Sequence, residues 1–215
     1  MANDNTLLRF ALHINHCTDM PNAALVPPVK ACSVAENKRV LAVGRLDYQK
    51  GFDRLLEAWA LLPAALRETW RLDIFGQGEW EEMLKEKTRT LGIEASARVN
   101  KPTDKIFEEY AASSFLAMSS HYEGFPMVMI EAMACGLPVV CFDFLCGPKD
   151  IITPGENGLL AKEGDIPALA AAMQEVMEDT CLLEKMSVEA RKIMDTYSER
   201  AVMARWESLF KALTA

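Results

Sequence analysis

The clearest structural signal in this chain lies at residues 39–62, which read RVLAVGRLDYQKGFDRLLEAWALL. The first six residues are mostly aliphatic and end at Gly44, as expected for a buried strand followed by a tight turn. After a polar loop, five apolar residues recur near helical spacing and form one stripe: Phe52, Leu55, Leu56, Trp59 and Leu62. A strand that leads into an amphipathic helix is the first part of a βαβ unit.

The same alternation continues along the chain. Further β-rich runs are RLDIF (71–75), ARVN (97–100), SFLAMS (114–119) and PVVCF (138–142), and helical patterns begin near residues 52, 79, 103 and 126. This order predicts an α/β fold with a Rossmann-like, doubly wound parallel sheet and helices on both faces. From Asp165 onward the pattern is helical, and Trp206, Leu209 and Phe210 mark the expected buried side of the last helix.

The length of the chain favours one domain. Its 215 residues, 50% of them hydrophobic, can form one sizeable α/β core. Residues 1–37 are poorly patterned, and Pro21, Pro27 and Pro28 exclude a long helix or a central strand there. We predict that residues 1–37 are a linker or the remnant of a missing N-terminal domain, and that residues 38–215 form the ligand-binding domain.

Charge and cysteine usage limit the class of partner and the compartment. With 23 Lys and Arg against 31 Asp and Glu, the net charge of -8 disfavours nucleic acid or an anionic membrane surface as the main partner. The six cysteines form no C-x-x-C pair, which indicates a reduced, cytoplasmic location. The sequence shows no signal-peptide pattern and no apolar run of transmembrane length.

Ligands of open parallel sheets bind beyond the carboxyl ends of the strands, so the residues just after each strand are informative. The first such loop is VGRLDYQKG, residues 43–51. Gly44 permits a close turn, and Arg45 and Lys50 place two cations before a helix N-terminus, a combination suited to a diphosphate. The alternative interpretation is that both cations are ordinary surface charges.

The second loop, IFGQGE (74–79), contains two glycines. Gly76 and Gly78 are spaced as in a dinucleotide fingerprint, but Glu81 replaces its third glycine. A tight turn that lets the backbone approach a ligand is therefore favoured over a dinucleotide site.

The third segment, HYEGFPMVMIEAMACGLPVV (121–140), holds two carboxylates. Glu123 lies in a loop, Pro126 opens a helix, and Glu131 lies near the apolar face of that helix. A half-buried carboxylate is costly unless it meets hydrogen-bond donors, and sugar hydroxyls are such donors. The alternative is that Glu131 pairs with a neighbouring cation or with backbone N–H groups.

These motifs together resemble a known family. G-R-L-x-x-x-K-G, followed by E-G-F-P-x-x-x-x-E-A-M-A-C-G-x-P-V-V, is similar to the donor-binding domain of the family 4, or group 1, glycosyltransferases. Glu123 and Glu131 match the E-x7-E motif of that family, and the resemblance covers residues 38–213. It implies one half of a GT-B fold, in which this half binds a nucleotide-sugar donor.

The resemblance also implies a role for each motif residue. Arg45 and Lys50 would bind the donor diphosphate, Glu131 the ribose hydroxyls, and Glu123 a hydroxyl of the transferred sugar beside the N–H groups of Gly124 and Phe125. The full donor-binding set is Gly44, Arg45, Lys50, Gly76, Gly78, Glu123, Gly124, Phe125, Pro126 and Glu131. The residues expected to take part in catalysis are Glu123, Arg45 and Lys50. Transfer would retain the anomeric configuration.

No metal ion and no cofactor are expected, because the cations and a helix dipole would neutralise the leaving diphosphate. His13 and His16 have helical spacing but no third ligand in view. The donor would be a UDP-, GDP- or ADP-linked hexose. The acceptor would be a glycan or glycolipid of surface polysaccharide biosynthesis, and the full enzyme could associate peripherally with the inner face of the membrane.

The chain departs from the family pattern, because family members normally carry an N-terminal acceptor-binding domain. We therefore expect the chain alone to bind donor weakly and to transfer little or nothing without an acceptor-binding half, whether it is an excised domain or a subunit. The alternatives are a non-catalytic nucleotide-sugar-binding module, or an epimerase or phosphorylase on the same architecture. The sequence does not determine the base, the sugar, the acceptor, the linkage or the oligomeric state.

Overall fold

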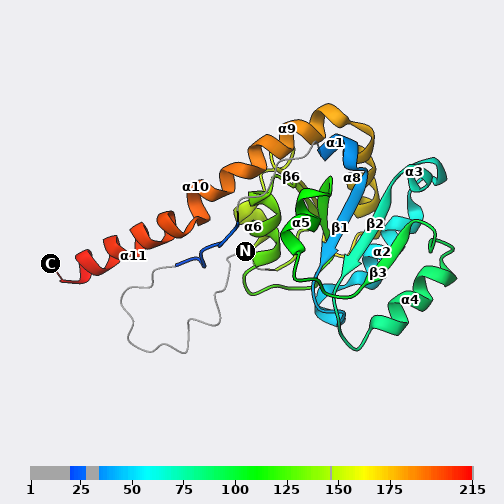
Figure 1. Cartoon of the computed structure of the whole chain (residues 1–215), viewed down its shortest axis with the longest axis horizontal. Coiled ribbons are helices and arrows are strands. Elements are labelled where there is room, and N and C mark those ends of the chain that lie inside the picture. Colours follow the sequence, from blue (N-terminus) through cyan, green and yellow to red (C-terminus); the bar gives the residue numbers. More distant parts are fainter. Residues whose placement is uncertain (1–19, 28–33, 146, 215) are drawn as a thin grey trace.

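The computed structural model describes residues 20–27, 34–145 and 147–214, and within them six parallel strands form one sheet in the order β3-β2-β1-β4-β5-β6 (Figure 1). The strands are β1 (Arg39–Val43), β2 (Arg71–Phe75), β3 (Ala97–Asn100), β4 (Phe115–Met118), β5 (Val139–Phe142) and β6 (Gly158–Ala161). The predicted α/β class, with a parallel Rossmann-like sheet, is confirmed. The order reverses between β1 and β4, which pair side by side although the chain visits β2 and β3 between them.

Helices cover both faces of this sheet. α2 (Phe52–Leu61) packs against α4 (Glu81–Thr90) and α8 (Ile166–Glu178) on one face. α5 (Ile106–Ala111) and α6 (Met127–Ala134) lie together on the other face (Figure 1). The remaining helices are α1 (Val34–Asn37), η2 (Tyr48–Lys50), α3 (Ala64–Thr69), α7 (Pro148–Ile151), α9 (Thr180–Ala190), η3 (Arg191–Ile193), α10 (Met194–Tyr197) and α11 (Glu199–Thr214).

The element boundaries agree with the sequence pattern to within a few residues. The helix expected near residue 79 begins at Glu81, and the helix expected near residue 103 begins at Ile106. Thr103 accepts a hydrogen bond from the Lys105 N–H at 3.1 Å, so it shapes the turn before α5 rather than its first turn. The short helix α3 was not expected, because the apolar stripe of α2 ends before it.

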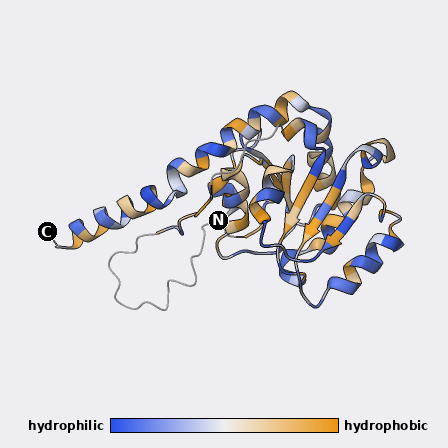
Figure 2. Cartoon of the chain, in the orientation of Figure 1, coloured by the Kyte–Doolittle hydropathy of each residue, from blue (hydrophilic) through white to orange (hydrophobic). Residues whose placement is uncertain are grey.

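The core lies between the sheet and the two helical layers. Every residue of β4 and β5 is buried, and both strands are apolar along their length. Figure 2 shows hydrophilic residues along much of α4, which lies on the outside of the molecule. Trp59 of α2 is fully buried and satisfies its indole N–H by donating to Ser96 Oγ at 3.0 Å. A core of this composition makes the sheet a rigid support for the loops at its edge.

The expected buried side of α11 is wrong. Trp206 is 36% exposed and Phe210 is 57% exposed, and Val202 near the start of the helix is the residue that is buried. The helix extends away from the sheet, as Figure 1 shows, and of the three predicted residues Leu209 alone is partly buried. Helical periodicity identifies an apolar face but not the surface that would cover it.

The predicted boundary at residue 38 stays a prediction. Val34 of α1 is buried, and α1 packs against α9. Ala24 is also buried and donates its N–H to the Tyr197 carbonyl at 2.9 Å. Most of the predicted linker lies outside the described residues, with His13 and His16 among it.

In the part of the chain that the structure describes, the search for a helix both long enough and apolar enough to cross a bilayer finds none.

The loops after β1 and β2 pack so closely that Gly76 admits no side chain. A β-carbon on Gly76 would lie 1.9 Å from the carbonyl oxygen of Gly44, and backbone hydrogen bonds from Leu46 to Gln77 (2.9 Å) and from Trp80 to Leu46 (2.9 Å) hold the loops together. Gly76 and Gly78 therefore allow the loop after β2 to pack against the loop after β1, a contact that the sequence did not predict.

We predict that Gly76→Ala lowers the free energy of unfolding by about 1–3 kcal/mol, since backbone must move to admit the methyl group. Urea denaturation measures the change. Gly124→Ala is the matched control, because no atom lies within 4 Å of a β-carbon there. An equal change in both variants would contradict the packing argument.

Candidate functional site

The reversal of strand order between β1 and β4 brings two loops together at the carboxyl edge of the sheet. Residues 44–51 follow β1 and residues 119–126 follow β4. In open α/β sheets this switch point is where ligands bind, because the adjacent helices leave the sheet toward opposite faces and open a crevice. Two of the three predicted motif segments therefore meet at one place.

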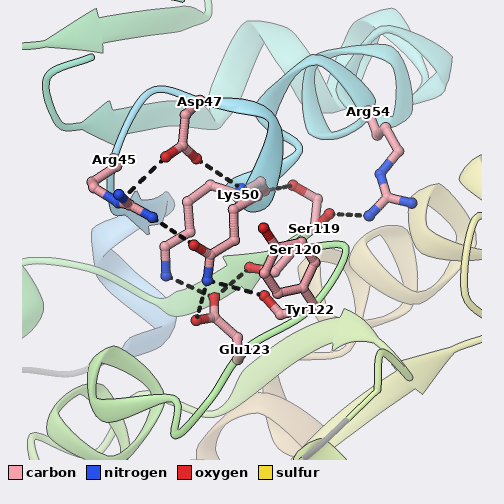
Figure 3. A network of polar contacts seen from close by, with 9 residues as sticks. Arg45, Asp47, Lys50, Arg54, Ser119, Ser120, Tyr122 and Glu123 are labelled. Carbon is pink, nitrogen blue, oxygen red and sulfur yellow. Dashed lines mark hydrogen bonds and ion pairs between the residues drawn. The ribbon is translucent and has the colours of Figure 1, made fainter. Parts of the chain in front are cut away.

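An ion pair joins the two loops. Lys50 Nζ lies 2.6 Å from Glu123 Oε1, and the side chains are only 13% and 7% exposed (Figure 3). Ser120 Oγ donates to the same carboxylate oxygen at 2.7 Å. A largely enclosed pair is stable only when both charges keep partners, so each group depends on the other or on a ligand that replaces it.

Gln49 and Arg45 extend this network toward solvent. Arg45 Nη2 donates to Gln49 Oε1 at 2.6 Å, and Arg45 Nε lies 3.3 Å from Asp47 Oδ2. Gln49 Nε2 donates to the Tyr122 carbonyl at 3.2 Å and to Glu123 Oε2 at 3.4 Å. The Arg45 side chain remains 69% exposed, so it is available to an anion.

Arg54 of α2 holds the start of the loop that follows β4. Its guanidinium donates to the Ser119 carbonyl and to Glu163 Oε1 (2.8 Å), and lies 4.7 Å from the centre of the Phe142 ring. Ser119 Oγ in turn donates to the Gly51 carbonyl at 2.8 Å. The start of α2 and the end of β4 are thereby held together (Figure 3).

A cleft of about 400 Å³ opens beside this network. Its lining is mostly apolar: Val43, Gly44, Arg45, Phe75, Gly76, Gln77, Pro102, Thr103, Ile106, Tyr110, Val128 and Glu131. Lys50 connects the cleft to the ion pair, because a β-carbon on Gly44 would lie only 2.8 Å from Lys50 Cε. The cleft therefore offers an apolar pocket with the Glu131 carboxylate and Arg45 in its lining, and Lys50 lies next to it against Gly44.

Glu131 is the carboxylate inside the cleft. Burial raises its pKa above the ordinary value, and a hydrogen bond from the Tyr110 hydroxyl to Oε2 at 3.2 Å lowers it in part. Burial, and then the charge of Glu131, raises the pKa of Tyr110. Tyr110 therefore donates to Glu131, and Glu131 can still accept further hydrogen bonds. Among the described residues neither a cation nor a backbone N–H group pairs with the Glu131 side chain, which was the alternative interpretation of the sequence.

Comparison with known proteins assigns the family. The family model of the group 1 glycosyl transferases matches residues 30–193, which is most of the chain. The chain belongs to this family. A glycosyltransferase of Haemophilus influenzae of uncharacterised function is 32% identical over 206 residues, which cover 96% of the chain and 58% of that protein. The amylovoran biosynthesis glycosyltransferase AmsD of Erwinia amylovora is 34% identical over 81% of the chain and 48% of its own length.

Solved structures show the same fold. A mutant of TarM from S. aureus, solved with fondaparinux, α-GlcNAc-glycerol and UDP, superimposes with a TM-score of 0.81 at 24% identity. The match covers 95% of this chain and 41% of TarM. The expectation that the chain is one half of a GT-B fold is confirmed, and the chain spans about half the length of the curated relatives it matches.

The predicted donor-binding residues of this group 1 member fall into four places. Gly44, Arg45, Gly76 and Glu131 line the cleft, and Lys50 and Glu123 form the adjacent ion pair. The remaining four residues are Gly78, in the loop that contacts Leu46, and the 124–126 segment, Gly124, Phe125 and Pro126.

The segment after Glu123 offers backbone rather than side chains. The N–H groups of Gly124 and Phe125 donate to no group in the described residues. The Phe125 ring packs against the Tyr197 ring, at a centroid distance of 5.9 Å, and Pro126 is the buried N-cap residue of α6. These residues therefore present two N–H donors beside Glu123.

Sequence reasoning missed four residues of the site. Gln49, Ser120 and Arg54 were not singled out, although Gln49 directly precedes Lys50 within the motif. Tyr110 lies on α5, far from either motif in sequence, and no local signal marks it as the partner of Glu131. Within the described residues, no three His, Cys, Asp or Glu side chains are grouped so that they could hold a metal ion.

We predict that Glu131 makes stability depend on pH. The pKa of Glu131 in the folded chain is raised above the ordinary value of 4.5. The contribution of Glu131 to the free energy of unfolding is therefore fully present below pH 4.5 and is lost as the pH rises through the raised pKa. Urea denaturation of Glu131→Gln, which stays neutral, should therefore show a gain over the wild type that grows above pH 4.5.

Tyr110→Phe provides the internal check. The Tyr110 hydrogen bond lowers the pKa of Glu131, so its removal should move this loss of stability to higher pH. A stability difference between Glu131→Gln and the wild type that is independent of pH would refute the assignment.

Proposed function

We propose that this chain is the donor-binding domain of a retaining, metal-independent glycosyltransferase. It would move a hexose from a nucleotide diphosphate sugar to a glycan or glycolipid acceptor in surface polysaccharide biosynthesis. The observation that carries the proposal is the enclosed Lys50–Glu123 pair beside an apolar cleft that contains Glu131. A nucleotide sugar carries a base suited to an apolar pocket, then ribose hydroxyls suited to a carboxylate, then a diphosphate suited to cations.

The chemistry of the cleft fits the parts of a nucleotide sugar. Ile106 and Val128 offer apolar surface to a base, and the Glu131 carboxylate accepts hydrogen bonds from vicinal ribose hydroxyls. Arg45 and Lys50 at the rim face the diphosphate, and Arg45 supplies a planar guanidinium suited to phosphate oxygens. This arrangement directs the sugar toward Glu123.

Donor binding would exchange the partners of the ion pair. The diphosphate replaces Glu123 as the partner of Lys50, and a sugar hydroxyl replaces Lys50 as a donor to Glu123. Neither charge is left without a partner, which avoids the cost of an isolated enclosed charge. When the glycosidic bond to the diphosphate breaks, Lys50 and Arg45 stabilise the charge that develops on the leaving group.

An acceptor-binding half would complete the enzyme. The curated relatives are about twice as long as their match to this chain, as their coverage of 58% and 48% indicates. Met203, Trp206, Phe210 and Leu213 lie at helical spacing along α11 and are exposed, which offers an apolar face to such a half. A cytoplasmic location and peripheral association of the full enzyme with the membrane remain predictions.

Thermal unfolding with UDP, GDP, ADP and their hexose conjugates tests the site. A ligand at 100 times its dissociation constant should add about 2.7 kcal/mol to the stability of the wild type. We predict that Lys50→Ala and Glu131→Ala lose most of this ligand-induced gain, each compared with its own ligand-free stability. A chelator should leave the wild-type gain unchanged.

Lys192→Ala is the matched control, because Lys192 also pairs with a glutamate (Glu189, 2.7 Å) but lies in η3. It should keep the full gain. Unchanged gains in both site variants would exclude this cleft as the donor site.

Activity distinguishes the enzyme from the alternatives. The chain alone should transfer little, and transfer or slow donor hydrolysis should rise when an acceptor-binding half is supplied, since the reaction needs both substrates in a closed cleft. Tight donor binding with no turnover in any such mixture would favour a non-catalytic module. Conversion of the bound sugar to its epimer without transfer would favour an epimerase.

A further inference from the structure

We infer that Gln49 is a positioning residue that sets both the diphosphate-binding Arg45 and the sugar-binding Glu123; the inference rests on the proposed function. Its amide oxygen accepts from Arg45 Nη2 at 2.6 Å, and its amide nitrogen donates to Glu123 Oε2 at 3.4 Å. A single side chain thus contacts the groups expected to bind opposite ends of the sugar diphosphate.

Among the described residues, Gln49 is the one that donates a hydrogen bond to Oε2 of Glu123. Lys50 and Ser120 both bind Oε1, at 2.6 and 2.7 Å, and Gln49 binds Oε2. When the diphosphate draws Lys50 away, Ser120 and Gln49 still hold one oxygen each. Two contacts on different oxygens fix the plane of the carboxylate, so Glu123 would keep its orientation toward the sugar after Lys50 has left.

The amide itself is anchored by the main chain. Gln49 Nε2 also donates to the Tyr122 carbonyl at 3.2 Å, which sets the direction of the amide and places its oxygen toward Arg45. An amide is required for this pattern, because one end must accept from a guanidinium while the other donates to a carbonyl and a carboxylate. Glutamate can supply only the first contact, and leucine supplies none.

The side chain of Gln49 can be changed without separating the loops. The His121 N–H donates to the Gln49 carbonyl at 2.9 Å, and this backbone hydrogen bond does not depend on the side chain. Stacking of the Tyr48 and His121 rings, with centroids 4.1 Å apart, adds a second link between the loops. Variants at Gln49 therefore report on the positions of Arg45 and Glu123 rather than on loop attachment.

The test compares two substitutions by calorimetry on the full chain, using pairs of ligands that each consist of a nucleoside diphosphate and a matching nucleotide sugar. UDP and UDP-glucose, and GDP and GDP-mannose, are titrated into wild type, Gln49→Leu and Gln49→Glu. The ratio of the two affinities within each pair measures the contribution of the sugar. Gln49→Leu should weaken both members of the pair that binds, by about tenfold for the nucleotide sugar, because hydrogen bonds to both charged groups are lost.

Gln49→Glu should separate the two contacts. Its carboxylate keeps an acceptor for Arg45, so the affinity for the free nucleoside diphosphate should stay within about twofold of the wild type. It no longer donates to Glu123 and repels that carboxylate, so the contribution of the sugar should fall by about tenfold. In a Glu123→Ala background, Gln49→Glu should cause no further loss, since the group it positions is gone.

Gln174→Leu is the matched control, because Gln174 donates to Glu178 at 2.9 Å on the exposed side of α8. It should bind both ligands as the wild type does. If the wild type binds neither of these pairs and binds neither ADP nor ADP-glucose, the proposed function fails and this inference with it. If the wild type binds and Glu123→Ala loses the sugar contribution while both Gln49 variants match the wild type, the inference alone is overturned.

Discussion

The pairing of β1 with β4 is the constraint on which the site depends. Val40 lies opposite Phe115 and Leu41 opposite Leu116, so these two buried strands end at the same edge of the sheet. The loop after each strand must then lie beside the other, whatever its sequence. Placing Lys50 in one loop and Glu123 in the other turns this proximity into an ion pair, and the rigid core beneath holds both groups in register.

Two cations, Lys50 and Arg45, are held close together in a chain that is acidic overall. Because the chain carries a net charge of -8, it repels a diphosphate in general and would bind one only where cations are held locally. Lys50 is paired with Glu123, so its charge is neither freely solvated nor buried without a partner. In the proposed function Arg45 differs, because its exposed guanidinium would contact an incoming phosphate before Lys50 leaves Glu123. Arg45 would therefore give the phosphate an exposed first contact, and Lys50 a buried second contact.

The sequence allowed the fold and the outline of the site to be predicted for a physical reason. Strand and helix periodicity are local, so the loop after each strand and the helix that follows it can be identified directly, and this singled out Lys50, Glu123 and Glu131. Contacts such as Tyr110 with Glu131 depend on how α5 lies beside α6 on one face of the sheet. Nothing within either segment encodes that distance, so the partner of Glu131 could be found only in three dimensions.

The glycines and α11 show two different limits of pattern reasoning. The spacing of Gly76 and Gly78 indicated a close approach of backbone, and the structure shows such an approach to the loop after β1, while the approach of a ligand stays a prediction. In α11 the apolar stripe was recognised, yet the surface expected to bury it is not in the described chain. In both cases the sequence pattern shows what the position needs, which is the absence of a side chain at the glycines and a covering surface for the apolar face of α11. The pattern does not show which part of a structure meets that need.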